Sequence, residues 1–107
     1  MKSHGVRFTA AELDDLTGIF DFVADRAGAA IAEGFVLRLE AACLSLDIAP
    51  LRGTARDDLR PGLRTFGVER RATILFTVNE ARREAVILGI FYGGRDVETL
   101  AAGREEG

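Results

Sequence analysis

The spacing of apolar residues changes once along this chain, and that change limits the folds it can adopt. Between residues 9 and 49, apolar residues recur at intervals of three and four, which places them on one face of a helix. From residue 63 to residue 92 the interval becomes two, which is typical of β-strands. The pattern predicts helices followed by a sheet, packed together in an α+β domain.

The helical half begins with a short strand, expected at residues 6–8. Thr9 and Glu12 have the spacing of a capping box, which predicts a helix that starts at Thr9. Gly28 separates this helix from a second one, which we expect to end before Pro50 because proline disfavours a helical conformation in the preceding residue. The stripes expected to face the core are Leu13, Leu16, Phe20, Val23 and Ala27 in the first helix, and Ile31, Phe35, Leu39, Ala42, Cys43 and Leu46 in the second. The residues expected on the solvent side of the first helix are Asp14, Asp15, Asp21 and Asp25.

The pattern of the second half of the sequence predicts a β-sheet. Residues 50–62 contain two prolines and two glycines and are expected to form a loop. Strands are expected at residues 63–66, 72–78 and 84–92, with a hairpin at 79–83. Residues 85–91 are apolar on both faces, as expected of a central strand that helices cover on at least one side. The order is βααβββ in a single domain, residues 1–107, with a core of about residues 6–98, a weakly helical segment after residue 97 and flexible termini.

Some classes of function are disfavoured by composition. The one cysteine, Cys43, leaves no partner for a disulfide or a CxxC metal site, and its place on the apolar stripe predicts a core thiol in a reducing compartment. The one histidine, His4, makes a catalytic triad or a histidine-based metal site improbable. No apolar run approaches the about 18 residues of a membrane-spanning helix, and no secretory signal follows the N-terminus. We therefore expect a cytoplasmic protein without metal, cofactor or membrane partner.

Charge is unevenly distributed along the chain. The net charge is −3, yet residues 50–83 contain eight arginines and four acidic residues. The planar guanidinium group binds carboxylates and phosphates in a bidentate manner, so this block predicts an acidic protein partner or a nucleic-acid backbone. Thirteen of the fourteen basic residues are arginine, and the codon bias of a GC-rich genome is the alternative explanation.

Two runs of residues resemble a known family. They are residues 56–66, RDDLRPGLRTF, and residues 87–96, ILGIFYGGRD. Together they resemble the toxins of bacterial type II toxin–antitoxin modules, the RelE/ParE superfamily, and look most like the ParE branch. The resemblance covers about residues 6–98. It implies a helical hairpin packed on a small, curved, mainly antiparallel sheet, in agreement with the order of elements above.

The resemblance also implies a function. The ParE branch is associated with poisoning of DNA gyrase, so the expected activity is inhibition of gyrase and replication, neutralised by a cognate ParD-like antitoxin. We expect no sequence-specific binding of nucleic acid by this chain itself. The residues expected to bind the target or the antitoxin are Arg56, Arg60, Arg64, Arg70, Arg71, Tyr92 and Arg95.

Two alternatives stay open at this point. The RelE branch cleaves messenger RNA on the ribosome, and Arg64, Arg71 and Tyr92 could serve that chemistry if Glu69 acted as the base. The second alternative is an adaptor that binds the antitoxin but is not toxic. The arginines also have a purely structural interpretation, in which Arg56 pairs with Asp57 or Asp58 in the loop and the Arg95–Asp96 pair caps the sheet. If they instead lie exposed on the sheet, they contribute little to folding.

Overall fold

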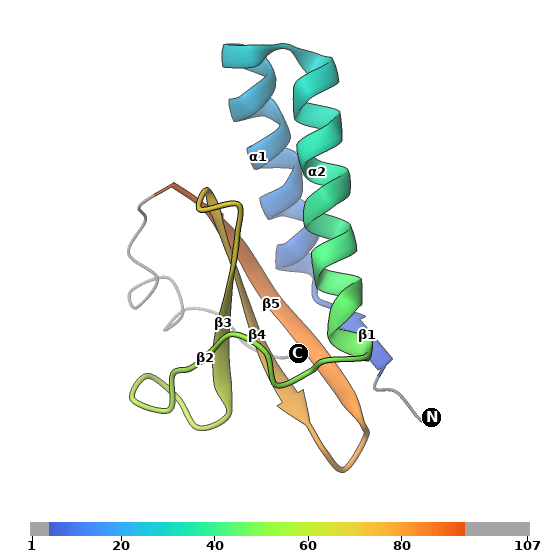
Figure 1. Cartoon of the computed structure of the whole chain (residues 1–107), viewed down its shortest axis with the longest axis vertical. Helices are drawn as coiled ribbons and strands as arrows, with labels where there is room; N and C mark the ends of the chain where they lie inside the picture. The colour runs from blue at the N-terminus through green and yellow to red at the C-terminus, as the bar shows by residue number, and fades with distance from the viewer. Residues whose placement is uncertain (1–4, 94–107) are drawn as a thin grey trace.

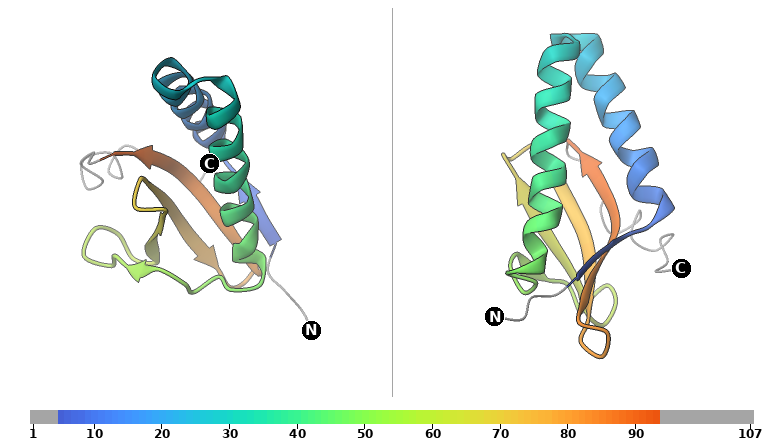
Figure 2. Two further views of the ribbon diagram at one scale, coloured as in Figure 1. Left: turned by 45° about the horizontal axis from the view of Figure 1, so that its top comes forward. Right: turned by 90° about the vertical axis from the view of Figure 1, so that its right-hand side faces the viewer.

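The computed structural model describes residues 5–93. Two helices form a hairpin that packs on one face of a curved, five-stranded sheet (Figures 1 and 2). The elements in chain order are β1 (Gly5–Phe8), α1 (Ala10–Ala27), α2 (Ala29–Leu44), a single 3-10 turn (Ser45–Asp47), β2 (Thr54–Ala55), β3 (Leu63–Val68), β4 (Ala72–Asn79) and β5 (Glu84–Tyr92). The expectations for His4, for Arg95 and Asp96, for the segment after residue 97 and for the two termini lie outside the described residues.

The sheet confirms the predicted fold class and adds one strand. Its order is β1-β5-β4-β3-β2, with β1 parallel to β5 and the other pairs antiparallel. The predicted strands are all present, with β3 two residues longer than expected. The prediction that residues 50–62 form only a loop is wrong at β2, which pairs with β3 through Thr54–Thr65 and Ala55–Arg64. Two residues are too few to give a periodic signal in the sequence.

The helices cover the sheet largely with the predicted faces, since Leu16, Val23, Phe35, Leu39, Cys43 and Leu46 are buried as expected, but two predicted members are exposed. In α1 the buried residues are Glu12, Leu16, Ile19 and Val23, whereas Leu13 is 66% exposed. In α2 they are Ala32, Phe35, Leu39 and Cys43, whereas Ile31 is 56% exposed. Consecutive residues of a helix are about 100° apart, so Leu13 and Ile31, at the edges of the predicted stripes, point to solvent, whereas Ile19 and Ala32 lie in the core. The prediction that Cys43 is a core thiol is confirmed, and burial raises its pKa to about 12.

The opposite face of the sheet carries a second apolar cluster. Its buried members are Leu63, Leu75, Val86, Leu88 and Phe91, and Leu59 of the loop packs against them. β5 contributes to this cluster and to the core beneath the helices. β5 lies between β1 and β4 with the helices over one face, so the prediction of a central strand that helices cover on at least one side is confirmed.

Two side chains, one at the N-cap of α1 and one in its second turn, form hydrogen bonds with backbone groups of β5 beyond the point where β1 ends. Thr9 is the N-cap of α1, as expected, but its side chain makes no capping hydrogen bond and its hydroxyl donates to the Ile87 carbonyl at 2.9 Å. The Asp15 carboxylate accepts a hydrogen bond from the Ile90 N–H at 2.9 Å. Asp15 was expected to face solvent, and the structure corrects this. The two contacts join the start of the helical hairpin to the central strand.

Glu12 gives the fold a pH dependence. It is 6% exposed, and burial, with added repulsion from Glu40 and Asp15, raises its pKa above the ordinary 4.5. The folded state therefore binds this proton more tightly than the unfolded chain does, so this group lowers stability as pH rises above about 4.5. We expect Glu12→Gln to raise the melting temperature at pH 7 and to flatten its decline with pH. The exposed Glu33→Gln is the control, and equal pH profiles for Glu12→Gln and the unaltered chain would contradict the assignment.

Candidate functional site

The arginine-rich loop is braced by its own side chains. Arg56 donates from Nε and Nη2 to the two carboxylate oxygens of Asp58, both at 3.1 Å. Asp57 accepts the Gly62 N–H at 2.8 Å, and Gly62 has a φ of +81°, which favours glycine. Arg60 is half-buried in the same turn. Arg56 thus has the structural role considered above, with Asp58 as its partner.

The Arg64 side chain also forms hydrogen bonds within the chain. Its Nη2 donates to the Leu51 carbonyl at 2.5 Å, and its Nε donates to the Arg52 carbonyl at 3.3 Å. A third, longer contact reaches the Gly53 carbonyl at 3.5 Å. The guanidinium group therefore holds the backbone of residues 51–53 against β3, which gives Arg64 a structural role as well.

Arg70 and Arg71 lie at the β3–β4 turn and are both exposed. Glu69 and Arg70 are the central residues of this turn and have positive φ angles, 55° and 59°. The Arg71 N–H donates to the Val68 carbonyl at 3.0 Å and closes the turn. Positive φ is uncommon for residues other than glycine and asparagine, so the surrounding contacts have to hold the turn in place.

An ion pair ties this turn to α2. Arg38 donates to both carboxylate oxygens of Glu69, at 2.6 and 3.2 Å. These hydrogen bonds lower the pKa of Glu69. A carboxylate that is bound in this way is a poor acceptor for a proton of a substrate hydroxyl.

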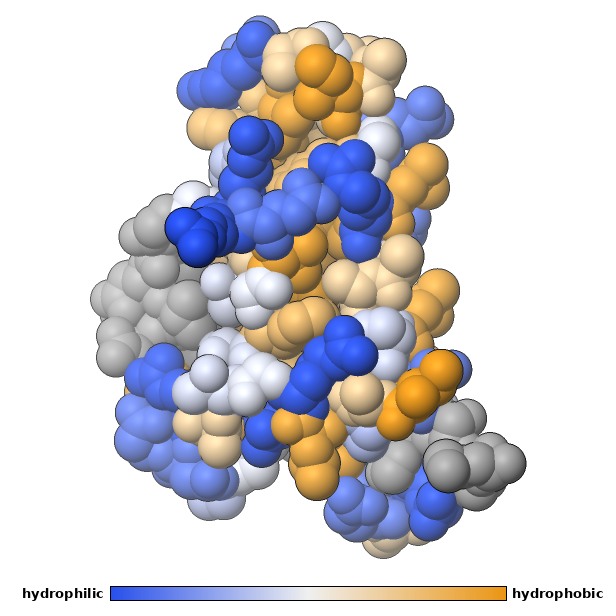
Figure 3. All heavy atoms as spheres, viewed as in Figure 1, coloured by the Kyte–Doolittle hydropathy of each residue, from blue (hydrophilic) through white to orange (hydrophobic). Residues whose placement is uncertain are grey.

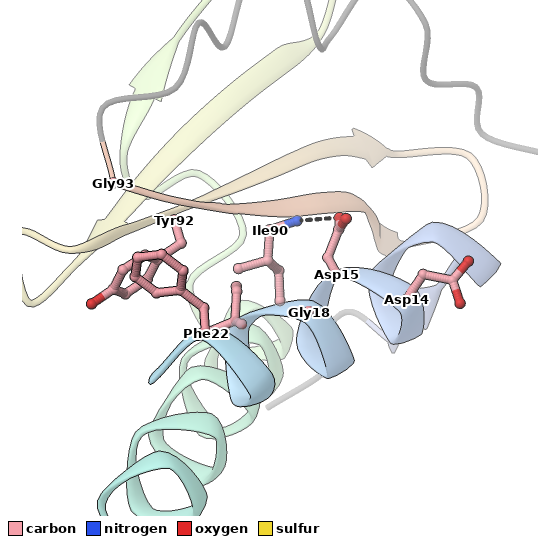
Figure 4. A pocket seen from close by; sticks show the side chains of 8 residues that line it. Asp14, Asp15, Gly18, Phe22, Ile90, Tyr92 and Gly93 are labelled. Carbon is pink, nitrogen blue, oxygen red and sulfur yellow. Dashed lines mark hydrogen bonds between the residues drawn. The ribbon is translucent and has the colours of Figure 1, made fainter. Parts of the chain in front are cut away.

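Tyr92 belongs to an aromatic cluster at the same end of the sheet. Its ring lies 5.2 Å from that of Phe22 and 5.7 Å from that of Phe35, between centroids. The Arg26 guanidinium stacks over Phe22 at 3.6 Å. Figure 4 shows the Phe22 and Tyr92 rings side by side at one end of a surface cavity between α1 and β5. The cavity has a volume of about 450 Å³, and Asp14, Asp15, Gly18, Ile19, Phe22, Ile90, Tyr92 and Gly93 line it.

The structure brings some of the predicted site residues together and separates others. Tyr92 pairs with Ala72 across β4 and β5, and the Gly93 N–H donates to the Arg71 carbonyl at 2.8 Å, so Arg71 and Tyr92 are neighbours. Arg64 pairs with Phe76, four residues further along β4 than Ala72, or about 13 Å at the usual rise of a strand. Arg64, Arg71 and Tyr92 do not form one cluster. We call Arg70, Arg71 and Tyr92 the turn site.

Several residues of this region were missed in the sequence. Phe22 and Arg26 have the i, i+4 spacing of neighbours on a helix, which could have indicated their stacking. Arg38 and Asp15 gave no signal, because their partners Glu69 and Ile90 are 31 and 75 residues away.

The described part of the chain offers little for other kinds of site. Residues 5–93 contain no group of three or more histidine, cysteine, aspartate or glutamate side chains arranged to hold a metal ion. Neither α1 nor α2 is long and apolar enough to cross a membrane.

Comparison with known proteins identifies the family. The model described as ParE toxin of the type II toxin–antitoxin system parDE matches residues 6–97. The chain belongs to the ParE toxin family. Toxin ParE3 of Caulobacter vibrioides is 37% identical over 79 residues, which cover 74% of this chain and 76% of that relative.

Solved structures share the fold of this ParE-family chain. A chain of the chromosomal ParDE system from P. aeruginosa has a TM-score of 0.72 and 25% identity, over 84% of this chain and 96% of its own length. The RelBE2 toxin–antitoxin complex of Mycobacterium tuberculosis gives 0.63 with 18% identity, over 89% and 97%. The isolated E. coli RelE toxin gives 0.51 with 13% identity, over 94% and 96%. The last two show a common fold, and the predicted resemblance to the RelE/ParE superfamily is confirmed.

Alanine substitutions of two arginines in this ParE-family chain are expected to differ in their effect on the stability of the fold. Arg64→Ala removes hydrogen bonds to three carbonyls and should cost about 1–2 kcal/mol, since bonds from a charged group contribute more than neutral ones but these are partly solvated. Arg71→Ala removes an exposed side chain and should cost under about 0.5 kcal/mol. Urea denaturation of both variants measures the difference. Equal stabilities would mean that the contacts of Arg64 to residues 51–53 do not hold the loop.

Proposed function

We propose that this ParE-family toxin inhibits DNA gyrase in the cytoplasm and is neutralised by a ParD-like antitoxin. The observation that carries the proposal is the match to the ParE toxin model over residues 6–97, which includes the LRPGLR run and the last strand. The relative from Caulobacter vibrioides and the ParDE system from P. aeruginosa support the same branch.

The contacts of the candidate catalytic residues argue against cleavage of messenger RNA. Cleavage of RNA needs a base for the ribose hydroxyl, an acid for the leaving oxygen and cations on the phosphate. Glu69, the candidate base, is held by Arg38, and Arg64 is bound to the carbonyls of residues 51–53. Tyr92 is packed against two phenylalanine rings. Glu69 and Arg64 are therefore engaged in holding the fold, and the packing of the Tyr92 ring fixes its position.

We propose the turn site as the surface that contacts the target. Arg70 and Arg71 are exposed, and they belong to a turn that the Arg38–Glu69 pair holds in place. Tyr92, which precedes the Gly93 that donates to the Arg71 carbonyl, adds a half-buried aromatic ring at the same end of the sheet. Arginine and tyrosine are enriched among the residues that dominate binding energy at protein interfaces. In this proposal Arg56, Arg60 and Arg64 act indirectly by shaping the adjoining loop, and Arg95, which lies outside the described residues, stays a candidate contact.

Controlled expression tests the proposal. Expression of the chain alone should arrest growth, with DNA damage and blocked replication while translation continues at first. Co-expression with the product of the adjacent gene should restore growth. Arg70→Ala with Arg71→Ala should weaken the arrest without lowering the melting temperature, whereas Asp21→Ala, an exposed change on α1, should leave it intact.

Three results would count against the proposal. Rapid loss of messenger RNA, cut at codons within ribosomes, would favour the ribonuclease. Normal growth with folded, full-length protein would favour an adaptor without toxicity. Full toxicity of the double arginine variant would show that the turn site is not the contact surface.

A further inference from the structure

The β3–β4 turn has a backbone conformation that its two central residues do not favour by themselves. Glu69 and Arg70 both have positive φ angles, 55° and 59°, and the Arg71 N–H donates to the Val68 carbonyl at 3.0 Å. Turns with this geometry between β-strands usually contain Asn-Gly. A residue with a Cβ atom loses free energy in the left-handed region. The turn therefore needs support from outside its own sequence.

Helix α2 supplies that support through one side chain. Arg38 donates from Nε to Oε2 of Glu69 at 2.6 Å and from Nη2 to Oε1 at 3.2 Å. These hydrogen bonds are the largest cause of the lowered pKa of Glu69, so the carboxylate stays charged at neutral pH. In Figure 3 a band of hydrophilic atoms, drawn blue, crosses the molecule at the height where this turn and α2 lie in Figure 1. A bidentate pair fixes orientation as well as distance, so it fixes the turn relative to α2.

The surroundings of Arg38 fit this role. Gly34 lies one helical turn earlier, and a Cβ atom added there would be 3.3 Å from Nη1 of Arg38, so the glycine leaves space for the guanidinium group. The guanidinium carbon lies 5.7 Å from the centroid of the Phe35 ring, which packs edge-on against Tyr92. Arg38 therefore contacts the turn through Glu69 and the ring that positions Tyr92.

The Arg38–Glu69 pair is too exposed to contribute much to the stability of the whole domain. The two side chains are 55% and 39% exposed, and exposed ion pairs add little to the free energy of unfolding. A local element opens at a much lower cost than the whole domain does, so the same pair has a larger effect on the turn. Loss of the pair should change the conformation of the turn and leave the rest of the chain folded.

We infer that Arg38 is the positioning residue of the turn site. Its pairing with Glu69 holds the β3–β4 turn in the conformation that presents Arg70 and Arg71 at the end of the sheet where Tyr92 lies. This inference rests on the proposed function, in which the turn site contacts DNA gyrase. Arg38 acts through the turn and does not itself contact the target. A change on α2 should therefore weaken inhibition while every residue of the turn site is retained.

The first test removes each partner of the pair. Arg38→Ala and Glu69→Ala should each weaken the inhibition of gyrase supercoiling about fivefold, which corresponds to an ion pair at the upper end of the exposed range. The double variant should be no weaker than either single variant, because residues that act only as a pair are not additive. Arg38→Lys should be intermediate, since lysine keeps the charge without the bidentate geometry.

The matched control is Arg7→Ala. Nε of Arg7 donates to Glu84 at 3.2 Å, and the two side chains are 40% and 18% exposed, so this change also breaks a partly exposed ion pair. Glu84 lies at the opposite end of β5 from Tyr92. Arg7→Ala should inhibit gyrase as strongly as the unaltered chain does. Equal weakening by Arg7→Ala and Arg38→Ala would overturn the inference, because the effect would then not depend on the turn.

Glycine at position 69 separates positioning from direct contact with the target. Glycine adopts a positive φ without the cost of a Cβ atom, so the turn no longer needs the pair. Glu69→Gly should retain inhibition, and Arg38→Ala combined with Glu69→Gly should recover what Arg38→Ala alone loses. If the combined variant stays as weak as Arg38→Ala, Arg38 contacts the target itself and its positioning role is wrong.

Hydrogen exchange of the Arg71 N–H reports on the turn in the absence of any target. This N–H closes the turn, so its exchange should be about fivefold faster in Arg38→Ala and should return to the original rate in the variant that also carries Glu69→Gly. Melting temperatures should show that all the variants are folded. Unchanged exchange in Arg38→Ala would overturn the inference.

The outcomes distinguish the inference from the function on which it rests. If the unaltered chain inhibits gyrase and folded Arg38→Ala inhibits it equally, the inference is overturned and the proposed function stands. If the unaltered, folded chain does not inhibit gyrase, the proposed function fails and the inference fails with it.

Discussion

The Phe35→Ala variant is expected to lose about 3–5 kcal/mol of folding free energy, the usual cost of removing a buried aromatic side chain. Phe35 is 2% exposed, and its ring packs edge-on against Tyr92 between α2 and the sheet. Small domains are stable by only about 5–15 kcal/mol, so this change takes a large part of the total. Growth arrest should weaken because less folded protein is present.

Phe22→Ala is the matched control for Phe35→Ala. Phe22 contacts the same tyrosine at 5.2 Å but is 42% exposed, so less apolar area is lost on truncation. Urea denaturation should place Phe22→Ala at least about 1 kcal/mol above Phe35→Ala in stability. Equal losses would mean that the Tyr92 contact, and not burial in the core, determines the cost.

Gly53→Ala should have the next largest effect, about 2–4 kcal/mol, from a strained backbone and overpacking together. Gly53 has a φ of +84°, and a Cβ atom there would lie 2.1 Å from the Thr65 carbonyl oxygen. The backbone at Gly53 and the carbonyl group of Thr65 cannot move apart without disturbing the pairing of β2 with β3. The contacts of Arg64 to residues 51–53 should be lost at the same time.

Gly62→Ala isolates the part of this cost that comes from the close approach. Gly62 has a similar φ of +81°, but no atom lies within 4 Å of a Cβ atom added there. It should therefore show only the backbone cost, of order 1 kcal/mol. Thermal melts of the two variants give the comparison, and similar melting temperatures would contradict the role of the Gly53–Thr65 contact.

The order of elements could be predicted from the sequence because it depends on local periodicity. Gly28 marks the junction of the helices, where it has a φ of +97°, and the strands follow the change of period. The centres of the helix faces were predicted correctly, because Leu16, Val23, Phe35 and Leu39 are buried as expected, but the edges of those faces were less predictable. Leu13 and Ile31 fit the apolar stripes as well as Ile19 and Ala32 do, and only the sheet beneath the helices determines which of them are buried.

The sequence indicated which types of residue form the site, but it did not indicate how those residues are arranged. The sequence marks the arginines as unusual, but it does not distinguish Arg64, which holds the loop, from Arg70 and Arg71, which are exposed. The turn at residues 69 and 70 contains no glycine or asparagine that would indicate its positive φ angles. It is held by Arg38, from a helix 31 residues earlier, and no local pattern could indicate that contact.

The most direct test is a supercoiling assay with purified DNA gyrase, relaxed plasmid and increasing amounts of the folded chain. We predict that supercoiling declines as the chain is added, and that Arg70→Ala with Arg71→Ala is weaker in this assay at unchanged thermal stability. The same preparation should leave messenger RNA intact in a translating extract. Undiminished supercoiling at excess folded chain, with messenger RNA cut in the extract, would contradict the account.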